Sequence, residues 1–216
     1  MSGFHHVSVL LDECIEGLKI RPDGIYVDGT LGGAGHSSQI AARLTTGRLI
    51  GIDRDSVAQE AAAKRLAPWM DRVTLIHSNF SELSAVLEQA NVPAADGMLF
   101  DLGVSSPQLD DASRGFSYMQ DAPLDMRMNQ RAGKTAADIV NTYDEKQLAD
   151  IFYLYGELKQ SRKIAAAIVK SRQTMKIQTI GEFLEVVKPF FKNEREKKDM
   201  AKVFQALRIE VNHEMD

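Results

Sequence analysis

The chain has 216 residues, of which 44% are hydrophobic and 26% charged, with a formal net charge of −4. These values are those of an ordinary globular protein, with room for one α/β domain plus an insert or for two small domains. No apolar run approaches the ~20 residues of a membrane span, and no basic segment followed by an apolar core opens the chain, so neither a transmembrane nor a secreted protein is expected. The single cysteine, Cys14, excludes an internal disulfide and a cysteine-based metal site, and a cytoplasmic location is expected.

Short apolar runs alternate with helical patterns over the first hundred residues. The runs predict strands at 25–28, 49–53, 73–77 and 97–101. The patterns between them predict helices at 36–44, 56–66 and 81–90, the last with Ser81 as its N-cap. Strand–helix alternation this regular indicates right-handed crossovers and a parallel sheet.

A glycine-rich turn follows the first predicted strand. Asp28 to Ser37 reads D-G-T-L-G-G-A-G-H-S and opens the next helix. Glycine tolerates positive φ and lets a ligand approach the backbone, and the first turn of a helix offers N–H groups. This combination predicts an adenosine-type cofactor at the sheet edge. Its expected neighbours are Asp53 for the ribose hydroxyls, Phe80 beside the adenine, and Asp101 at the end of the fourth strand.

Two cofactor classes share these features, a dinucleotide and S-adenosylmethionine. Asp28 would repel a pyrophosphate but suits a cationic tail or a sulfonium, and the spacing G-x-x-G-G-x-G departs from G-x-G-x-x-G. We therefore favour S-adenosylmethionine. Alternatives stay open for three side chains: Asp28 as a helix cap only, Asp53 as a cap for the helix near Ser56, and His36 as a base rather than a cofactor contact. The remaining histidines show no ligand spacing, so no metal site is expected.

The periodicity stops between 103 and 135. An irregular stretch of this length inside a compact domain is usually functional or disordered, and its Phe, Tyr, Leu and Met content argues against disorder. Helical patterns resume beyond it. Capping boxes at Asp144–Gln147 and Thr179–Glu182 each precede an apolar face. Further helices are predicted at 161–173 and 194–214, and Pro189 ends the helix before it or closely follows its end.

The charge is distributed unevenly along the chain. Residues 1–155 carry a net charge of −8, whereas residues 156–208 carry +7. A basic segment of this kind is able to contact a polyanion, although charge alone favours a solvated helical surface. The chain also ends on a helix after only four predicted strands. A four-stranded parallel sheet would expose an edge, so we expect either further strands or a partner that covers it.

Several motifs together resemble a known family. Besides 28–37 they are D-L-G-V-S-S-P-Q-L-D (101–110), R-G-F-S (114–117), P-L-D-M-R-M (123–128), Y-G-E (155–157) and F-Q-A-L-R-I (204–209). Over essentially the whole chain they resemble the bacterial 16S rRNA cytidine-N(4) methyltransferase family (RsmH, also called MraW). The resemblance implies a class I S-adenosylmethionine-dependent methyltransferase core, Rossmann-like, with an inserted all-α domain that recognises substrate. The reaction it implies is methylation of the exocyclic amine of a cytidine in the small ribosomal subunit.

The resemblance also implies a division of the chain and a set of site residues. The core would take 1–108, an irregular loop plus helical domain 109–200, and a helix returning to the core 201–216. The family continues beyond this point into further strands, so we expect the chain to be incomplete. With the glycine turn included, the cofactor contacts would be Asp28, Gly33, Ala34, Gly35, His36, Asp53, Phe80, Asp101 and Gln108. Ala34 stands where the family more often has glycine.

The expected substrate contacts lie in the irregular stretch and the basic helices. They are Ser105, Ser106, Arg114, Phe116, Asp125, Arg127, Lys197 and Lys198. Asp101 is the catalytic candidate, because a cytosine amine must lose a proton and needs an acceptor; the alternative is a purely cofactor-binding role. Arg114 is expected either to bind phosphate or to brace the loop, and Asp125 with Arg127 either to line the pocket or to pair and hold the loop's shape.

Three other functions compete with this interpretation. They are a methyltransferase acting on another substrate such as DNA, a nucleotide-binding oxidoreductase, and a binding module without activity. The oxidoreductase would need G-x-G-x-x-G without a leading acid, which the turn does not have. The expected partner is 16S rRNA in the small ribosomal subunit, no membrane contact is expected, and the oligomeric state is left open with a dimer as one alternative.

Overall fold

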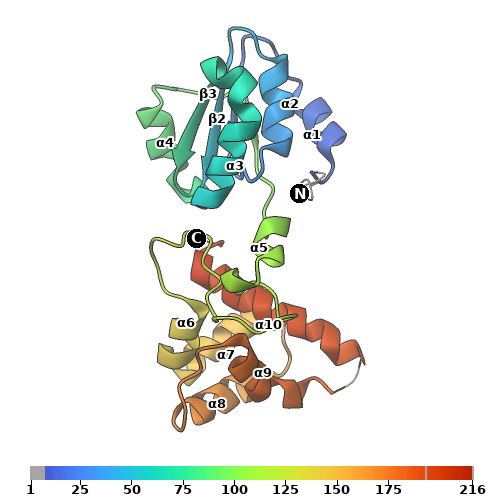
Figure 1. Cartoon of the computed structure of the whole chain (residues 1–216), viewed down its shortest axis with the longest axis vertical. Helices are drawn as coiled ribbons and strands as arrows, with labels where there is room; N and C mark the ends of the chain where they lie inside the picture. Colours follow the sequence, from blue (N-terminus) through green and yellow to red (C-terminus); the bar gives the residue numbers. More distant parts are fainter. Residues whose placement is uncertain (1–7, 193, 216) are drawn as a thin grey trace. The chain divides into compact units, whose positions relative to one another are not determined.

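The computed structural model describes residues 8–192 and 194–215, with the backbone alone for 194–197. It consists of two compact units, Met1–Gly103 and Val104–Asp216 (Figure 1). Each unit is described by itself below.

The first unit is built on a four-stranded parallel sheet. Its strands are β1 (Ile25–Asp28), β2 (Arg48–Asp53), β3 (Val73–His77) and β4 (Gly97–Leu99). They lie in the order β3-β2-β1-β4, so that β1 is paired on both sides. Val27, for example, lies opposite Ile50 on one side and Met98 on the other. The parallel α/β sheet predicted from the alternating pattern is confirmed.

Helices cover both faces of this sheet. Successive strand residues point to opposite faces, and Tyr26 and Val27 accordingly enter two different cores. Tyr26 packs with residues of three helices, α1 (Leu11–Leu18), α2 (Gly35–Arg43) and α3 (Ser56–Leu66). Val27 packs with Val86 of α4 (Leu83–Gln89). A sheet buried on both faces explains why its strands read as continuous apolar runs.

Three details of this unit differ from the sequence analysis. Helix α1 had not been predicted, although its apolar residues recur at helical spacing. The predicted N-cap Ser81 is wrong: Asn79 accepts from the Ser81 N–H at the head of a short 3-10 turn, and α4 begins after it. Strand β4 ends at Leu99 rather than residue 101, because the Asp101 N–H bonds to the Thr30 side chain instead of continuing the ladder.

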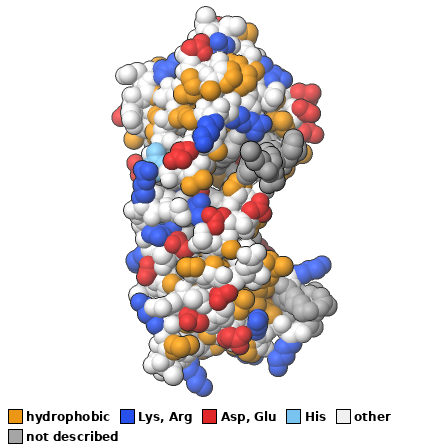
Figure 2. Space-filling model, viewed as in Figure 1, with side chains coloured by type: hydrophobic (Ala, Val, Ile, Leu, Met, Phe, Trp, Pro, Cys, Tyr) orange, Lys and Arg blue, Asp and Glu red, His pale blue; other side chains and the backbone are white. Residues whose placement is uncertain are grey.

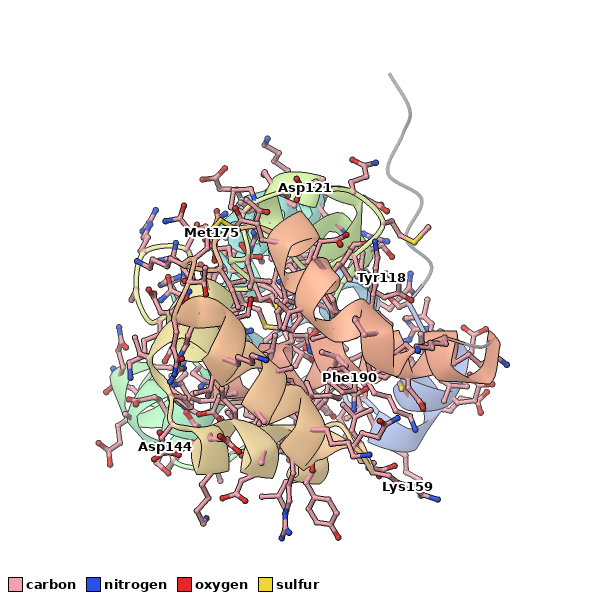
Figure 3. The ribbon with its side chains drawn as sticks, turned by 90° about the horizontal axis from the view of Figure 1, so that it is seen from below. Tyr118, Asp121, Asp144, Lys159, Met175 and Phe190 are labelled. Carbon is pink, nitrogen blue, oxygen red and sulfur yellow. The ribbon has the colours of Figure 1, made fainter. Side chains whose placement is uncertain are left out.

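The second unit is helical. Its helices are α5 (Ser106–Asp110), α6 (Ala136–Thr142), α7 (Glu145–Leu154), α8 (Ser161–Arg172), α9 (Ile180–Val187) and α10 (Glu194–Asn212). The predicted capping boxes are confirmed at the starts of α7 and α9, and Asp144 marks the start of α7 in Figure 3, which views the molecule from below. Pro189 lies in a 3-10 turn directly after α9, as predicted.

The last helix belongs to this unit. α10 packs against α7 and α6, with Val203, Phe204 and Leu207 buried in the helical core. The return of the 201–216 helix to the core stays a prediction. The predicted boundaries at 108 and 200, and the insertion of this unit into the core, stay predictions.

The irregular stretch from 103 to 135 is part of the helical core. Phe116, Leu124, Met126 and Met128 are all buried in it. Gly115 is required where R-G-F-S turns toward P-L-D-M-R-M, because it has φ +73° and a Cβ there would lie 2.6 Å from the Pro123 carbonyl oxygen. These four apolar residues therefore serve as packing, and Gly115 permits a close approach of two backbone segments.

Replacing Gly115 with alanine should strongly destabilise the helical unit. The control is Gly133→Ala, since Gly133 also has positive φ (+86°) but has no atom within 4 Å of an added Cβ. The control should cost about 1 kcal/mol for the left-handed conformation, and Gly115→Ala about 3 kcal/mol or more because backbone must move as well. Urea unfolding followed by circular dichroism measures both. Equal losses would show that the close approach at Gly115 is not a constraint.

Candidate functional site

The loops that follow the strands meet at the carboxyl edge of the parallel sheet. β1 lies between β2 and β4 in the sheet. Helix α2, which follows β1, and helix α4, which precedes β4, pack on opposite faces of the sheet. In such sheets, ligands bind where the connections diverge to the two faces. Asp28, Asp53, Phe80 and Asp101 all belong to this edge, since each ends a strand or closely follows one.

The glycine turn after β1 is held to the neighbouring strand. The Leu31 N–H donates to the Ile52 carbonyl at 3.0 Å, and the Ala34 N–H donates to the Leu31 carbonyl at 2.8 Å. Gly32 and Ala34 both adopt positive φ, +49° and 59° respectively. Ala34 is fully buried. Its left-handed conformation, which glycine would adopt freely, costs about 1 kcal/mol because of the Cβ of alanine.

Asp28 is a buried carboxylate beneath this turn. It is 1% exposed, its Oδ2 accepts from the Ser37 hydroxyl at 2.7 Å, and its Oδ1 accepts from the Thr30 N–H at 3.1 Å. Burial raises the pKa of Asp28 above its usual value, and these two hydrogen bonds oppose the rise. Because Ser37 lies in the first turn of α2, Asp28 ties the end of β1 to that helix through a side-chain hydroxyl. It does not cap the helix, since the N-cap of α2 is Ala34, without a side-chain hydrogen bond to the helix N–H groups.

Asp53 ends β2 beside the same turn. Its Oδ2 accepts from the Gly32 N–H and its Oδ1 from the Asp55 N–H, both at 2.8 Å. The cap of α3 is Asp55, which accepts from the Val57 N–H, so the capping alternative for Asp53 is wrong. Burial raises the pKa of Asp53 despite these bonds. Each carboxylate oxygen has a second lone pair, so ribose hydroxyls can still donate to this half-buried side chain.

The first residues of α2 contact the start of the described chain. His36 is buried, and its Nε2 lies 3.1 Å from the Val9 carbonyl oxygen. A Cβ on Gly35 would collide with the Ser8 side chain. One ring nitrogen of His36 is therefore used within the protein, and the cofactor-contact and catalytic-base alternatives both stay predictions. Sequence reasoning had no signal for Val9 as its partner.

Aromatic side chains follow β3 and β4. The rings of Phe80 and Phe100 meet edge to face with centroids 5.7 Å apart, and the Arg54 guanidinium carbon lies 5.5 Å from the Phe80 centroid. Phe80 is half-buried, whereas Phe100 is 40% exposed. The structure thus keeps Phe80 beside the loop after β2, where the adenine contact is predicted. Phe100 and Arg54 had not been identified from the sequence.

Asp101 lies on the exposed segment that follows β4. Its N–H donates to the Thr30 Oγ1 at 2.6 Å, which connects this segment to the glycine turn. The carboxylate is on an exposed residue. Asp101 and the turn are therefore adjacent, and the proton-acceptor and cofactor-binding roles both stay predictions.

Gln108 has a structural role in α5. Ser105 and Gln108 form a capping box, in which the Ser105 N–H donates to the Gln108 Oε1 at 3.0 Å. Ser106 begins the helix and is exposed. The S-x-x-Q spacing is a sequence signature of such a cap and would have identified this role. The cofactor contact of Gln108 stays a prediction.

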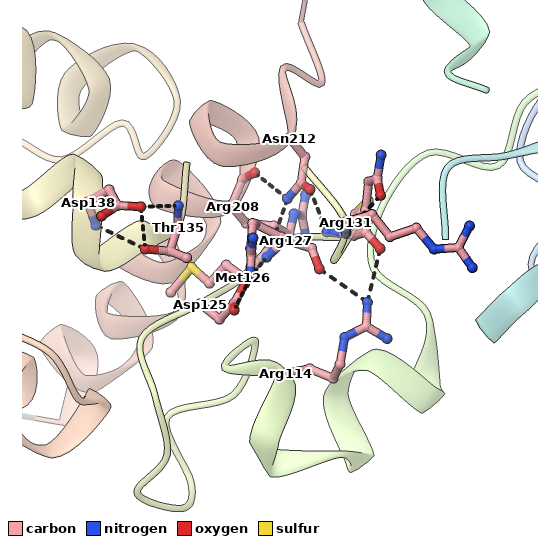
Figure 4. A network of polar contacts seen from close by, with 11 residues as sticks. Arg114, Asp125, Met126, Arg127, Arg131, Thr135, Asp138, Arg208 and Asn212 are labelled. Carbon is pink, nitrogen blue, oxygen red and sulfur yellow. Dashed lines mark hydrogen bonds and ion pairs between the residues drawn. The ribbon is translucent and has the colours of Figure 1, made fainter. Parts of the chain in front are cut away.

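Arg114, Asp125 and Arg127 belong to one polar network (Figure 4). The buried Arg114 donates to the carbonyl oxygens of Arg127 and Met128 at 3.1 and 3.2 Å. Arg127 donates to both carboxylate oxygens of Asp125 at 2.9 Å. Asn212 of α10 completes the network: its amide donates to the Met126 carbonyl at 2.8 Å and accepts from the Met128 N–H at 2.7 Å. This geometry favours the loop-bracing alternatives, and the substrate contacts stay predictions.

Phe116 and Tyr118 line a hollow of about 240 Å³ in the helical unit. The hollow is walled by Val104, Leu109, Phe116, Ser117, Tyr118, Ala201, Phe204, Gln205 and Arg208. The rings of Tyr118 and Phe204 lie 5.2 Å apart. Phe116 was predicted to line a substrate pocket, and it is buried with one side toward this hollow.

The basic residues of the helical unit lie among acids. Figure 2 shows Lys and Arg interspersed with Asp and Glu on the face drawn. Two of the lysines, Lys188 and Lys202, are paired with Glu185 at 3.6 Å and Asp199 at 3.4 Å. Lys198 is exposed, and the side chain of Lys197 lies outside the described residues. Exposed pairs of this kind contribute little to stability, so a lysine can exchange its carboxylate partner for a phosphate. The phosphate-binding and solvated-surface alternatives therefore both stay open.

The described part of the chain has neither a membrane-spanning helix nor a cluster of metal ligands. Over 8–192 and 194–215 no helix is long and apolar enough to cross a membrane. Among the side chains that the structure describes, no cluster of three or more His, Cys, Asp or Glu is arranged to hold a metal ion.

Comparison with known proteins identifies close relatives. A family model described as the MraW methylase family matches residues 3–216. The ribosomal RNA small subunit methyltransferase H of Bacteroides thetaiotaomicron is 57% identical over 98% of this chain and 68% of its own length. The protein of the same name from Brevibacillus brevis is 54% identical over 99% of this chain and 69% of its own. An rRNA methylase structure from Streptococcus thermophilus has 16% identity and a TM-score of 0.37 over 55% of this chain and 72% of its own, too weak a likeness to carry an argument.

Removing the charge of Asp28 should stabilise the protein at neutral and higher pH. A carboxyl whose folded-state pKa lies above its unfolded value of 3.8 makes stability fall as pH rises through the interval between the two pKa values. Asp28→Asn removes this loss while keeping partners for Ser37 and Thr30. Its free energy of unfolding should therefore exceed that of the wild type at pH well above this interval, with the advantage shrinking as pH falls through it.

The measurement is urea unfolding at a series of pH values. Glu60→Gln, which changes an exposed acid of α3, is the control and should show no such trend. An Asp28→Asn protein less stable than wild type throughout would mean that the two hydrogen bonds to the carboxylate outweigh its desolvation.

Proposed function

The chain belongs to the MraW methylase family, and from this premise we propose that it transfers a methyl group from S-adenosylmethionine to the exocyclic amine of a cytidine in 16S rRNA. The names of its relatives support ribosomal RNA of the small subunit as the substrate. The observation that carries the proposal is the convergence of the glycine turn, Asp53 and Asp101 on one sheet edge.

The residues at this edge fit an adenosine cofactor with a cationic group. Asp53 is half-buried, is held by two N–H groups and retains lone pairs for ribose hydroxyls. Asp28 and Asp53 end β1 and β2 at this edge, and acidic residues there suit a cationic tail and disfavour a pyrophosphate. α2 begins directly after the turn that contains Gly32 and Ala34, so the N–H groups of its first turn belong to the same edge of the sheet.

When bound, S-adenosylmethionine supplies a methyl group that its sulfonium has already activated. The protein's task is then to align the nucleophile and to remove a proton from it. A cytosine amine is a poor nucleophile because its lone pair is shared with the ring. The exposed carboxylate of Asp101 beside the turn is the acceptor that we assign to this proton.

The helical unit is proposed to hold the RNA. Its basic residues would contact phosphates, which position a nucleic acid without reading its sequence. The target cytidine is stacked or paired in folded RNA, so it must be swung out to reach an active site. The braced loop, in which Arg114 and the Asp125–Arg127 pair are held internally, would present Phe116 and Tyr118 on a rigid support.

The cofactor is tested by calorimetric titration of the chain. We expect binding of S-adenosylmethionine and none of NAD⁺. Asp53→Asn should weaken binding about tenfold or more. The amide oxygen that remains is a neutral acceptor, and the amide nitrogen cannot accept the backbone N–H that one carboxylate oxygen now accepts. Asp23→Asn, an exposed acid ahead of β1, should bind like the wild type. NAD⁺ binding without S-adenosylmethionine binding would favour the oxidoreductase instead.

The substrate is tested in the same experiment series. Intact small ribosomal subunits, naked 16S rRNA and DNA are incubated in parallel with labelled cofactor, and the modified nucleoside is identified after digestion. Label in N(4)-methylcytidine from rRNA is the expected result. Label in DNA, or in another nucleoside, would contradict the proposed substrate; cofactor binding without any transfer would leave the chain as a binding module.

Reversing two lysines of α10 tests the RNA surface. Lys197→Glu with Lys198→Glu should weaken RNA binding and reduce the slope of log affinity against log salt by about 1–2, since each phosphate contact releases roughly one counterion. Lys19→Glu with Lys64→Glu reverses two exposed lysines of the sheet unit and controls for total charge. An unchanged slope in the α10 variant would assign these lysines to the solvated surface.

A further inference from the structure

Thr30 hydrogen-bonds through both its backbone and its side chain. Its N–H donates to Asp28 Oδ1 at 3.1 Å, and its Oγ1 accepts from the Asp101 N–H at 2.6 Å. Asp28 in turn accepts from the Ser37 hydroxyl at 2.7 Å. A continuous series of hydrogen bonds therefore runs from the first turn of α2, through the buried carboxylate and the glycine turn, to the backbone of Asp101.

We propose that Thr30 is the positioning residue that sets the distance between the cofactor turn and the carboxylate of Asp101. This inference rests on the proposed function, in which Asp101 accepts a proton from the nucleophile. Thr30 acts through Asp101 and needs no contact of its own with cofactor or substrate. Its side chain would be the link that makes the turn and the acceptor move as one body.

The reason lies in how β4 ends. The last ladder contact between β1 and β4 pairs Asp28 with Leu99, and the Gly29 N–H then donates to the Leu99 carbonyl at 2.9 Å. Beyond this point the chain is exposed, with Phe100 40% and Leu102 65% accessible. The Phe100 ring packs on Gly29, but a ring lying on a glycine does not direct the neighbouring amide. The hydroxyl of Thr30 supplies a directional contact at the residue that carries the proposed acceptor.

A displaced acceptor would affect the reaction more than it affects binding. Misplacing a reacting group by 1 Å can cost on the order of 100-fold in rate. The groups proposed to bind the cofactor, Asp53 and the turn backbone, are held by other bonds, such as the one from the Gly32 N–H to Asp53. Loss of the Thr30 hydroxyl should therefore lower kcat and leave cofactor affinity nearly unchanged.

The experiment compares Thr30→Val with Thr30→Ser. Valine keeps the shape of threonine and its backbone bond to Asp28 but cannot accept from the Asp101 N–H, whereas serine can. Thr74→Val, which removes the hydroxyl that accepts from Arg48 at 3.2 Å within the sheet, is the matched control. Hydrogen exchange of the Asp101 amide is followed by NMR on the protein without cofactor, and kcat and cofactor affinity are measured on the same samples.

We expect Thr30→Val to speed exchange of the Asp101 amide by about fivefold, the factor for one net hydrogen bond. Its kcat should fall about tenfold or more, with cofactor affinity within about threefold of wild type. Thr30→Ser should restore both exchange and kcat, and Thr74→Val should change neither.

Three results would overturn the proposal. They are unchanged Asp101 exchange in Thr30→Val, a kcat equal to wild type despite faster exchange, and a loss of cofactor affinity that accounts for the whole loss of rate. Failure of the proposed function is recognised separately, because a wild-type chain that neither binds the cofactor nor methylates RNA would show it. The exchange rates test the placement of Asp101 independently of any activity.

Discussion

The pairing of β1 with a strand on each side is the constraint from which the candidate site is built. This pairing brings the ends of β1, β2 and β4 to one edge in a fixed register. The glycine turn is then anchored to β2 by the Leu31 N–H and by Asp53, and to the segment after β4 by Thr30. The side chains that give the edge its acidic character are therefore positioned by main-chain geometry before any ligand is involved.

Local sequence signals predicted much of the fold. Apolar periodicity placed all four strands, and the spacing of capping residues placed the starts of α7 and α9, because these features depend on neighbours within four residues. The same rules would have found α1 and the Ser105–Gln108 cap. For the site, the glycine turn, Asp53 and Asp101 were identified because strand ends in a parallel sheet meet at one edge.

Contacts between distant residues were beyond such signals. No pattern in the chain pairs Thr30 with Asp101, or His36 with Val9. The sequence left Arg114 and Arg127 open between substrate contact and support of the loop, and their hydrogen bonds inside the protein favour support of the loop. The sequence could name the charged residues of the loop, but their partners are set by how the loop folds against α10, which depends on the whole helical core.

The bonds of Asn212 have a consequence for the order in which the helical unit can form. Its side chain bonds the backbone at residues separated from it by 84 and 86 positions. At about 5–20 residues per second, a translating ribosome needs roughly 4–17 s to add that much chain. During that time the P-L-D-M-R-M segment lacks its two hydrogen bonds to Asn212. The helical core that buries its methionines is also still incomplete. Because Asn212 lies in α10, its hydrogen bonds to this segment can form only after α10 has been synthesised.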